Sequence, residues 1–502
     1  MICISIAQPS RTLALADMLN AAQMGADLLE VRLDCFEKAP HLSELTDAKR
    51  KPLLLSCPRP QDGGTWQGSE EERQMLLRQA ILSKADYVEI ELDIADQIRP
   101  FPPCRRVISY TNLKETPDDI ADIYAEMQTR QPDIIKLTCR ARTPEEAWPL
   151  VQILAKPPVP TVVVGLGRPG VMLAVLGRKI GAPWTTAALE RGAEAYPGQP
   201  TVRDLEEIYH YRDIGKATRF VGVTGLGERE FLTTGVMNAA FAQLGIPHRV
   251  LPMQVGNLKL FRKIADVVKV QGVTLEEEFY ERAHEAAFLD ETAKFPVQAA
   301  DLLLPDTEHG WRGSNVLRRA AVSALEATMR EREPGGATSL QGKMVLFAGA
   351  WPPTRMLAPG LKERGASLIF ASKDRSAAQR MAQIFGGRQI AWEAIYSTHH
   401  DVLVVGRDGA PAEGAEVEEE ELPIHPGYLR AGMTILDLTS MPRSSRFVGE
   451  ARVRGCGVVD PGDLLIEQVR EHVRRITGEE CPADGLRQNL AGWLGEEGEK
   501  ET

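Results

Sequence analysis

The chain has 502 residues, of which 43% are hydrophobic and 26% are charged, and its formal net charge is −11. This length predicts two or three domains with sizeable cores. The acidic balance and the absence of a Lys/Arg-rich run argue against a nucleic-acid groove or an anionic membrane surface as a partner. An anionic substrate would therefore have to be attracted by local positive charge.

The N-terminal sequence MICISIAQPS enters a strand pattern without a basic leader, and no apolar run reaches the length of a membrane span. The seven cysteines are scattered singly, without CxxC or CxxH pairing. Isolated cysteines are typical of reduced, buried side chains. We therefore expect a cytoplasmic protein with no structural metal site.

The first ~215 residues alternate short apolar runs with amphipathic, helix-like segments. Eight strand–helix units in this length predict a (β/α)8 barrel over residues 1–217, with an open doubly wound sheet as the alternative. The expected strands lie at 2–7, 28–34, 52–57, 87–93, 105–110, 134–138, 161–166 and 184–189.

The strand rhythm restarts at FVGVTGLG, and a mixed α/β segment is expected over residues 218–329. A polar stretch containing glycine and proline then precedes four strands of the parallel-sheet type. These strands predict a Rossmann-type layer with C-terminal helices over 330–492, followed by a flexible tail at 493–502. The four runs lie at 344–350, 367–372, 401–406 and 433–439.

The apolar run IIKLT places one charged residue, Lys136, in the middle of a predicted barrel strand. Strand alternation points Lys136 toward the barrel axis, as it does Glu30 and Arg32 of the second strand. A desolvated lysine loses its proton more readily and can form an imine with a ketone. The alternative is that these charges form ion pairs that fill the barrel or line its rim.

Five motifs then occur in a familiar order and spacing: LLEVRLD, RPQDGG, VISYTNLKETP, DIIKLTC and YPGQPTVRDL. Together they resemble the type I 3-dehydroquinate dehydratases. From Phe220 onward the chain looks like shikimate dehydrogenase, up to the late segment ILDLTSMPRSSRFVGEARVRGCGVVDPGDLL. The resemblance covers nearly the whole chain and implies a divergent bifunctional protein of aromatic amino-acid biosynthesis. It implies a TIM barrel followed by a two-lobed α/β region.

The resemblance assigns roles to individual residues of the barrel. Lys136 falls on the lysine that forms the imine, and Glu30 and Arg32 fall on the polar pair that contacts the substrate hydroxyls. Arg59 falls near a substrate-binding arginine, although its loop is one residue shorter than usual, and Gln199 matches a glutamine of the lid. The implied substrate is a cyclic hydroxy acid like dehydroquinate, and the barrel needs no cofactor.

Three family positions of the barrel carry other residues in this chain. Thr111 replaces the histidine that shuttles protons, and threonine cannot titrate near neutral pH. Ala174 replaces the arginine that clamps the substrate carboxylate, with Arg168 and Arg178 as nearby candidates to take its place. Ala195 replaces the serine of the lid. These departures predict a weakened or retuned dehydratase.

The dehydrogenase-like part departs further from its family. Glu278 and Leu317 replace the lysine and aspartate that work on the oxidised hydroxyl. The cofactor turn FAGAWPPTRM keeps Gly349 and Arg355 but has Trp351-Pro352 where glycines are usual. Tryptophan fills the space of a phosphate, and proline removes an N–H donor.

The sequence does not exclude NADP as a ligand of this part. Lys373 follows the second strand of the predicted Rossmann-type layer and could contact a 2′-phosphate. We expect the dehydrogenase-like module to be inactive.

Three functions are consistent with these residues. The first is an imine-forming lyase fused to an inactive dehydrogenase-like module. The second is a protein that has lost catalytic activity and has a binding, regulatory or scaffold role. The third keeps the chemistry of Lys136 but acts on a different substrate. The expected partner is a small-molecule substrate, or for the second function a pathway intermediate or a partner protein. No nucleic acid or membrane is expected, and a homo-oligomer is left open.

Overall fold

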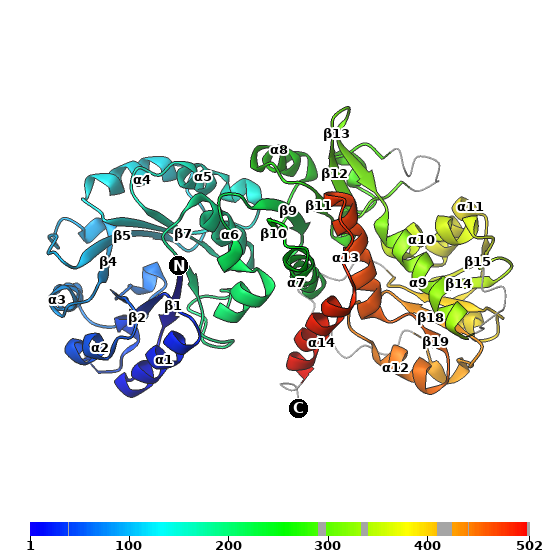
Figure 1. Ribbon diagram of the computed structural model, residues 1–502, viewed down its shortest axis with the longest axis horizontal. Coiled ribbons are helices and arrows are strands. Elements are labelled where there is room, and N and C mark those ends of the chain that lie inside the picture. Colours follow the sequence, from blue (N-terminus) through cyan, green and yellow to red (C-terminus); the bar gives the residue numbers. More distant parts are fainter. Residues whose placement is uncertain (39, 290–297, 333–339, 409–423, 440, 499–502) are drawn as a thin grey trace. The chain divides into compact units, whose positions relative to one another are not determined.

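The computed structural model describes residues 1–38, 40–289, 298–332, 340–408, 424–439 and 441–498. The chain forms two compact units (Figure 1). The first unit is Met1–Arg219 with Pro247–Val268, and the second unit is Phe220–Ile246 with Lys269–Thr502. The segment Pro247–Val268 thus joins the first unit although it lies beyond the predicted boundary at residue 217. The boundaries at residues 329 and 492 stay predictions.

The first unit contains the eight-stranded parallel barrel that the sequence predicts. Its strands are neighbours in the order β7-β6-β5-β4-β3-β2-β1-β8, a near-closed barrel. Each predicted run coincides with one strand, and the open doubly wound alternative is excluded. The strands are β1 (Ile2–Ile6), β2 (Leu28–Arg32), β3 (Leu53–Ser56), β4 (Tyr87–Glu91), β5 (Arg105–Asn112), β6 (Ile134–Arg140), β7 (Thr161–Leu166) and β8 (Thr185–Ala187).

Helices follow most of the barrel strands, and local sequence explains where they begin. Ser69 and Glu72 form a reciprocal capping box at the start of α3, and Thr143 caps α5 just before a proline. The chain after β8 forms a π-helical turn at Asp204–Ile208 in place of a long helix. The helices are α1 (Arg11–Gln23), α2 (Leu42–Ala48), α3 (Glu70–Leu82), α4 (Ile120–Thr129), α5 (Pro144–Ala155) and α6 (Val171–Ile180).

The interior of the barrel is built in layers, because side chains two residues apart on a strand share a face. An apolar layer comes from near the starts of the strands: Cys3, Leu28, Leu54, Tyr87, Val107, Ile134, Val162 and Trp184. Two residues further along each strand stands a mostly polar layer: Ser5, Glu30, Ser56, Glu89, Ser109, Lys136, Val164 and Thr186. The apolar layer therefore forms a dry floor beneath the polar one.

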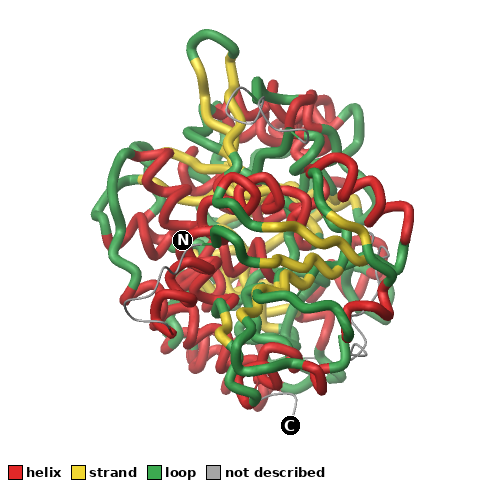
Figure 2. Tube along the Cα trace, turned by 90° about the vertical axis from the view of Figure 1, so that its right-hand side faces the viewer, coloured by secondary structure: helices red, strands yellow, loops and turns green. Residues whose placement is uncertain are grey.

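The second unit contains two sheets. Strands β9, β11, β12 and β13 are neighbours in that order, and the antiparallel β12–β13 hairpin projects from this sheet (Figure 1, Figure 2). A parallel sheet in the order β16-β15-β14-β17-β18-β19 confirms the Rossmann-like layer. The strands are β9 (Arg219–Thr224), β11 (Val273–Thr274), β12 (Leu302–Asp306), β13 (Gly310–Ser314), β14 (Met344–Ala348), β15 (Ser367–Ala371), β16 (Arg388–Gln389), β17 (Val402–Val405), β18 (Thr434–Asp437) and β19 (Gly457–Val458).

The remaining elements complete the two units. The first unit also holds β10 (His248–Met253) and α8 (Leu258–Val268). The last helix continues to Gly498, past the boundary expected at residue 492. The helices of the second unit are α7 (Glu228–Gln243), α9 (Val316–Arg332), α10 (Pro352–Glu363), α11 (Arg375–Phe385), α12 (Arg446–Val453), α13 (Pro461–Thr477) and α14 (Asp484–Gly498).

One buried arginine ties α3 to the barrel. Arg73 is fully buried, and its Nη1 donates to both carboxylate oxygens of Glu91 at 2.8 and 2.9 Å and to the carbonyl of Cys57 at 2.8 Å. Removing one partner of a buried ion pair costs about 3–5 kcal/mol. We expect Arg73→Met to lower the free energy of unfolding of the barrel by that amount, measured by hydrogen exchange of the β4 amides in urea.

Arg78→Met is the matched control, because Arg78 is exposed on the same helix. It should change the free energy of unfolding by no more than about 0.5 kcal/mol. Equal effects of the two substitutions would show that the buried pair contributes nothing special to the barrel.

Candidate active site

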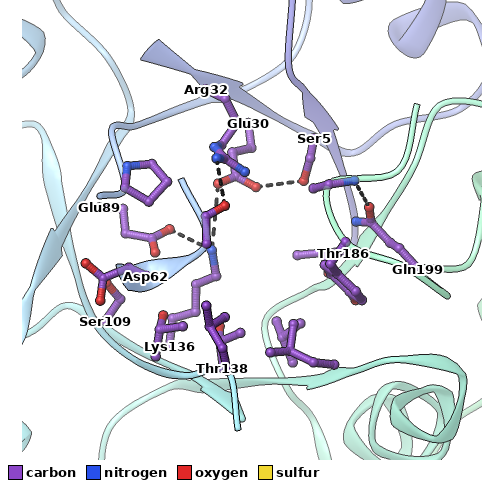
Figure 3. A pocket seen from close by; sticks show the side chains of 18 of the residues that line it. Ser5, Glu30, Arg32, Asp62, Glu89, Ser109, Lys136, Thr138, Thr186 and Gln199 are labelled. Carbon is purple, nitrogen blue, oxygen red and sulfur yellow. Dashed lines mark hydrogen bonds and ion pairs between the residues drawn. The ribbon is translucent and has the colours of Figure 1, made fainter. Parts of the chain in front are cut away.

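A pocket of about 90 Å³ opens at the C-terminal ends of the barrel strands, where barrel enzymes place their chemistry (Figure 3). Most of the polar layer lines it, together with residues one further step along the strands. Its lining residues are Ser5, Glu30, Arg32, Pro58, Asp62, Gly63, Glu89, Glu91, Ser109, Thr111, Leu113, Lys136, Thr138, Val164, Leu166, Thr186, Ala195, Tyr196 and Gln199.

Lys136 projects from β6 into the pocket and stands between two carboxylates (Figure 3). Its Nζ donates to Oε2 of Glu89 at 2.7 Å and lies 3.7 Å from Oε1 of Glu30. The residue is only 8% exposed. The paired carboxylates explain how the barrel can bury an ammonium group.

Glu30 is held by hydroxyl groups from the two neighbouring strands. Ser5 of β1 donates to its Oε2 at 2.7 Å, and Ser56 of β3 donates to its Oε1 at 2.9 Å. Burial would raise the pKa of Glu30, but the positive charges of Lys136 and Arg32 and the two hydroxyls hold it below its ordinary value. Glu30 is therefore an ionised carboxylate at neutral pH.

The other two carboxyls on β4 differ from Glu30. Burial raises the pKa of Glu89 despite the opposing charge of Lys136, and the negative charge of Glu30 raises it further. Burial also raises the pKa of Glu91, to about 7, against the opposing charge of Arg73. The carboxyl groups of the pocket thus have pKa values shifted in opposite directions, as in sites that need both an acid and a base.

The state of the lysine itself differs from the sequence-based expectation. Burial alone would lower the pKa of Lys136, but the charges of Glu30 and Glu89 outweigh burial and raise it. The expectation that desolvation would free the amine is therefore wrong for this arrangement, because it left out the carboxylate partners. The resting side chain is an ammonium ion.

The two predicted substrate-binding arginines are both paired within the chain. Arg32 lines the pocket but donates to Asp34 at 2.8 and 2.6 Å. Arg59 does not line the pocket, since its guanidinium donates to Asp62 at 2.6 Å and to Asp93 at 2.7 Å. A substrate contact by Arg59 stays a prediction that would require it to leave these carboxylates.

The replaced family positions of the barrel fall in different places. Thr111 and Ala195 line the pocket, whereas Ala174 does not. Neither Arg168 nor Arg178 lines the pocket either, in the part of the chain that the structure describes. The Arg178 guanidinium instead lies 5.7 Å from the centre of the Tyr211 ring. Neither arginine therefore replaces the missing clamp in this conformation.

Gln199 enters the pocket from the loop after β8, as the resemblance implies. Its Oε1 accepts from the backbone N–H of Ala195 at 2.7 Å. Its Nε2 is buried and has no hydrogen-bond partner among the described residues. A buried donor without a partner is costly, so this amide is available to a hydroxyl or carbonyl oxygen of a substrate.

Sequence reasoning missed Glu89, which together with Glu30 keeps Lys136 charged, and its neighbour on β4, Glu91. Glu89 and Glu91 stand in YVEIELD with the same alternation as LEVRLD, so the pattern could have revealed them. The hydroxyl of Ser5 and the ring of Tyr196 carried no comparable signal, because their place depends on which strands become neighbours.

In the second unit, the two predicted replacements at the dehydrogenase positions differ in exposure. Glu278 is exposed, and Leu317 is completely buried. An exposed carboxylate and a buried leucine cannot exchange a proton with one hydroxyl group.

Carboxylates of the chain itself bind donor groups at the turn between β14 and α10. The N–H of Ala350 donates to Asp408 at 3.2 Å, and Nε1 of Trp351 donates to Glu277 at 2.7 Å. Arg355 donates to both oxygens of Glu281, at 2.6 and 2.7 Å. Donor groups that could bind a pyrophosphate at such a turn thus already bind side-chain carboxylates of the chain.

The other predicted cofactor contacts serve local structure. Gly349 has φ +104°, and a Cβ there would lie 2.4 Å from the carbonyl oxygen of Gly406. The Lys373 Nζ lies 5.9 Å from the centre of the Trp392 ring, and its backbone N–H donates to Asp408 at 2.8 Å. The backbone therefore requires the glycine at position 349, and Lys373 has contacts within the chain.

Two further features bear on function. Among the described residues, no group of three or more His, Cys, Asp or Glu side chains is placed to hold a metal ion. Within the same residues, every helix is too short or too polar to cross a membrane.

Comparison with known proteins assigns the first unit. A family model described as type I 3-dehydroquinase matches residues 2–216. The 3-dehydroquinate dehydratase of Methanopyrus kandleri is 30% identical over 199 residues, which are 38% of this chain and 89% of that protein. The chain belongs to the type I 3-dehydroquinase family.

Outside its type I 3-dehydroquinase barrel, the chain also resembles longer proteins. The chloroplastic bifunctional 3-dehydroquinate dehydratase/shikimate dehydrogenase of Arabidopsis thaliana is 27% identical over 502 residues, covering 96% of this chain and 83% of that protein. The solved structure of dehydroquinate dehydratase and shikimate dehydrogenase from S. pombe aligns with 97% of this chain and 98% of that chain, at 18% identity and a TM-score of 0.43.

The charge balance of the pocket predicts how stability depends on pH in a variant without the lysine. In Lys136→Met the pKa of Glu30 should rise above that of an unfolded glutamate, and the already raised pKa of Glu89 should rise further, since their cation is gone. The folded state then binds more protons than the unfolded state, so the free energy of unfolding falls as pH rises from 5 to 8. Relative to wild type, the expected loss in the free energy of unfolding grows by about 1.4 kcal/mol for each unit by which the pKa of a carboxyl group increases.

Thermal unfolding of both proteins at pH 5 and pH 8 measures this difference. Lys136 stays protonated across the range in the wild type, so the carboxyls alone produce the slope. A deficit of equal size at both pH values would contradict the proposed pairing.

Proposed function

We propose that the first unit is an imine-forming lyase that dehydrates 3-dehydroquinate or a closely related cyclic hydroxy ketone. The observation that carries this proposal is Lys136, buried in the pocket between Glu30 and Glu89. It is supported by membership in the type I 3-dehydroquinase family. The chemistry needs no cofactor, because the imine formed on Lys136 is itself the electron sink.

The proposed reaction follows from the nucleophile and its surroundings. The amine of Lys136 attacks the ketone carbon, and loss of water gives a protonated imine. The positive nitrogen withdraws electrons, which acidifies the hydrogen on the neighbouring carbon. Removal of this hydrogen and departure of the hydroxyl group one carbon further on forms the double bond of the product.

The remaining pocket residues bind and orient the substrate in this proposal. Glu30, fixed by two serine hydroxyls, and Arg32 meet the substrate hydroxyls, and the free Nε2 of Gln199 donates to a further oxygen. Thr111 supplies a hydroxyl in place of a titrating imidazole. Loss of a general acid–base group costs roughly 10²–10⁴ in rate, so turnover is slow compared with a barrel that keeps the histidine.

A second candidate function is a binding or regulatory protein that holds a pathway intermediate without turning it over. The observation that favours it is that, among the described residues, the pocket lining contains no arginine without a carboxylate partner: Arg32 is paired with Asp34, and Ala174 lies outside the lining. A carboxylate substrate would lack its clamp. The two functions differ in whether a covalent adduct forms.

For the second unit we propose that it neither binds a dinucleotide tightly nor oxidises a hydroxyl group. Asp408, Glu277 and Glu281 occupy the donors of the β14–α10 turn, and their negative charges would repel a pyrophosphate. The unit therefore serves as a structural or binding module.

We also propose a cytoplasmic location and a dissolved small molecule as the ligand. All seven cysteines are free, and five of them are buried, as expected in a reducing compartment.

Reductive trapping tests the main proposal. Incubation with 3-dehydroquinate and sodium borohydride should add the mass of the reduced substrate to the peptide that carries Lys136. The reaction of the wild-type protein should be absent in Lys136→Met. The readout is mass spectrometry of the intact protein and of its peptides.

An unmodified protein at millimolar 3-dehydroquinate would exclude the lyase. The binding function would then be tested by calorimetry with the same compound.

The proposal for the second unit predicts the result of an NADPH titration. Nicotinamide fluorescence should show no saturable binding of NADPH below millimolar concentration, because carboxylates already hold the donors of the turn. Saturable binding in the micromolar range would contradict it.

A further inference from the structure

The proposed lyase leaves one chemical problem, and the inference below rests on that proposed function. Imine formation needs a neutral amine, but the Nζ of Lys136 is an ammonium held by Glu89 at 2.7 Å and by Glu30 at 3.7 Å. Bulk solvent has little access, since the residue is 8% exposed. The proton on Nζ must therefore leave to a group within the pocket.

The two carboxylates beside Nζ are not equivalent acceptors. Both oxygens of Glu30 already accept hydrogen bonds from serine hydroxyls, at 2.7 and 2.9 Å. These bonds stabilise its ionised form and oppose protonation. Glu89 also accepts a hydrogen bond, from the hydroxyl of Ser109, but it faces Nζ at the shorter distance, 2.7 Å against 3.7 Å.

The two other acids of the pocket are engaged elsewhere. Glu91 follows on the same strand, but Arg73 binds both of its oxygens, at 2.8 and 2.9 Å. Asp62 accepts from Arg59 at 2.6 Å. The geometry at Nζ therefore singles out one partner.

We propose that Glu89 is a catalytic residue that exchanges a proton with Lys136 during imine formation. The Nζ proton first moves to Oε2 of Glu89, which leaves a neutral amine and a carboxylic acid. The amine forms the N–C bond to the carbonyl carbon, and a second nitrogen proton passes to the carbonyl oxygen, giving a neutral carbinolamine. Glu89 then returns its proton to the carbinolamine hydroxyl, the C–O bond breaks, and water leaves.

The step balances without a further reactant. The ammonium and ketone become a protonated imine and one water molecule, and Glu89 ends as the carboxylate with which it began. The protonated imine keeps the positive charge of Lys136 at the same place. Glu30 can therefore remain ionised throughout and stabilise both the ammonium and the iminium ion.

The surroundings of Glu89 support this exchange. Burial and the negative charge of Glu30 raise the pKa of Glu89, which brings its acidic form within reach. The charged or titratable groups around it are Lys136 of β6, Glu30 and Arg32 of β2, Glu91 of β4, Cys3 of β1 and Tyr196. Burial raises the pKa values of Cys3 and Tyr196, so both are neutral near pH 7.

The test compares Glu89→Gln with Glu30→Gln, which remove the same charge from opposite sides of the lysine. Adduct formation with 3-dehydroquinate is quenched with borohydride at timed intervals between pH 6 and pH 9. The wild type and Glu30→Gln should show a shallow dependence on pH. In Glu89→Gln the amine must lose its proton to solvent, so the rate should be about 10²–10⁴ lower at pH 7 and rise about tenfold per pH unit.

Glu89→Asp serves as the conservative variant and should restore the shallow dependence at an intermediate rate. It also controls for misfolding, because it keeps the charge. Equal rates and slopes in wild type and Glu89→Gln would overturn the role of Glu89 while leaving the lyase intact. No adduct in the wild type would overturn the lyase and this role together.

Discussion

The ion pair between Lys136 and the carboxylates of Glu30 and Glu89 is the interaction on which the rest of the barrel site depends. An ammonium cannot be buried at this depth without opposite charge. The barrel provides that charge from β2 and β4, and it provides serines from β1 and β3 to hold one of the carboxylates. The same pairing that allows burial also keeps the amine protonated, so the site needs a proton acceptor before it can react.

The layers of the barrel explain why this cluster stands where it does. Side chains two residues apart on each strand share a face, so a closed parallel barrel stacks its inward residues in rings. Cys3, Leu28, Ile134 and their neighbours form an apolar floor. The polar ring lies directly above it, and the pocket opens above that ring.

Much of this arrangement is predictable from the sequence. The eight apolar runs identify the barrel, and alternation within LEVRLD and IIKLT identifies Glu30, Arg32 and Lys136 as inward residues. The same rule applied to YVEIELD would have identified Glu89. These predictions succeed because they depend on residues close together in one strand.

What could not be predicted depends on neighbours that are distant in the sequence. Whether Lys136 is neutral or charged is decided by Glu30 and by Glu89, the latter 47 residues away along the chain. The direction of Arg59 is decided by its bonds to Asp62 and Asp93. A loop motif shows which residue types are present, but their partners appear only once the strands and loops are placed in space.

The two units use their charged side chains differently. In the barrel, the charged cluster borders a pocket, so a substrate can reach Lys136. At the β14–α10 turn of the second unit, donor groups that could bind a phosphate instead bind carboxylates of the chain itself. These carboxylates belong to Asp408, Glu277 and Glu281. In the first unit, a group capable of covalent chemistry, Lys136, is in contact with a pocket.

The most direct test of this account is a crystal structure of the wild-type protein after borohydride reduction in the presence of 3-dehydroquinate. The account predicts continuous density from the Nζ of Lys136 to the substrate carbon that carried the ketone. It also predicts Glu89 within hydrogen-bond distance of the new secondary amine and Gln199 in contact with a substrate oxygen. A covalent group on another residue, or a substrate bound outside the barrel pocket, would contradict the account.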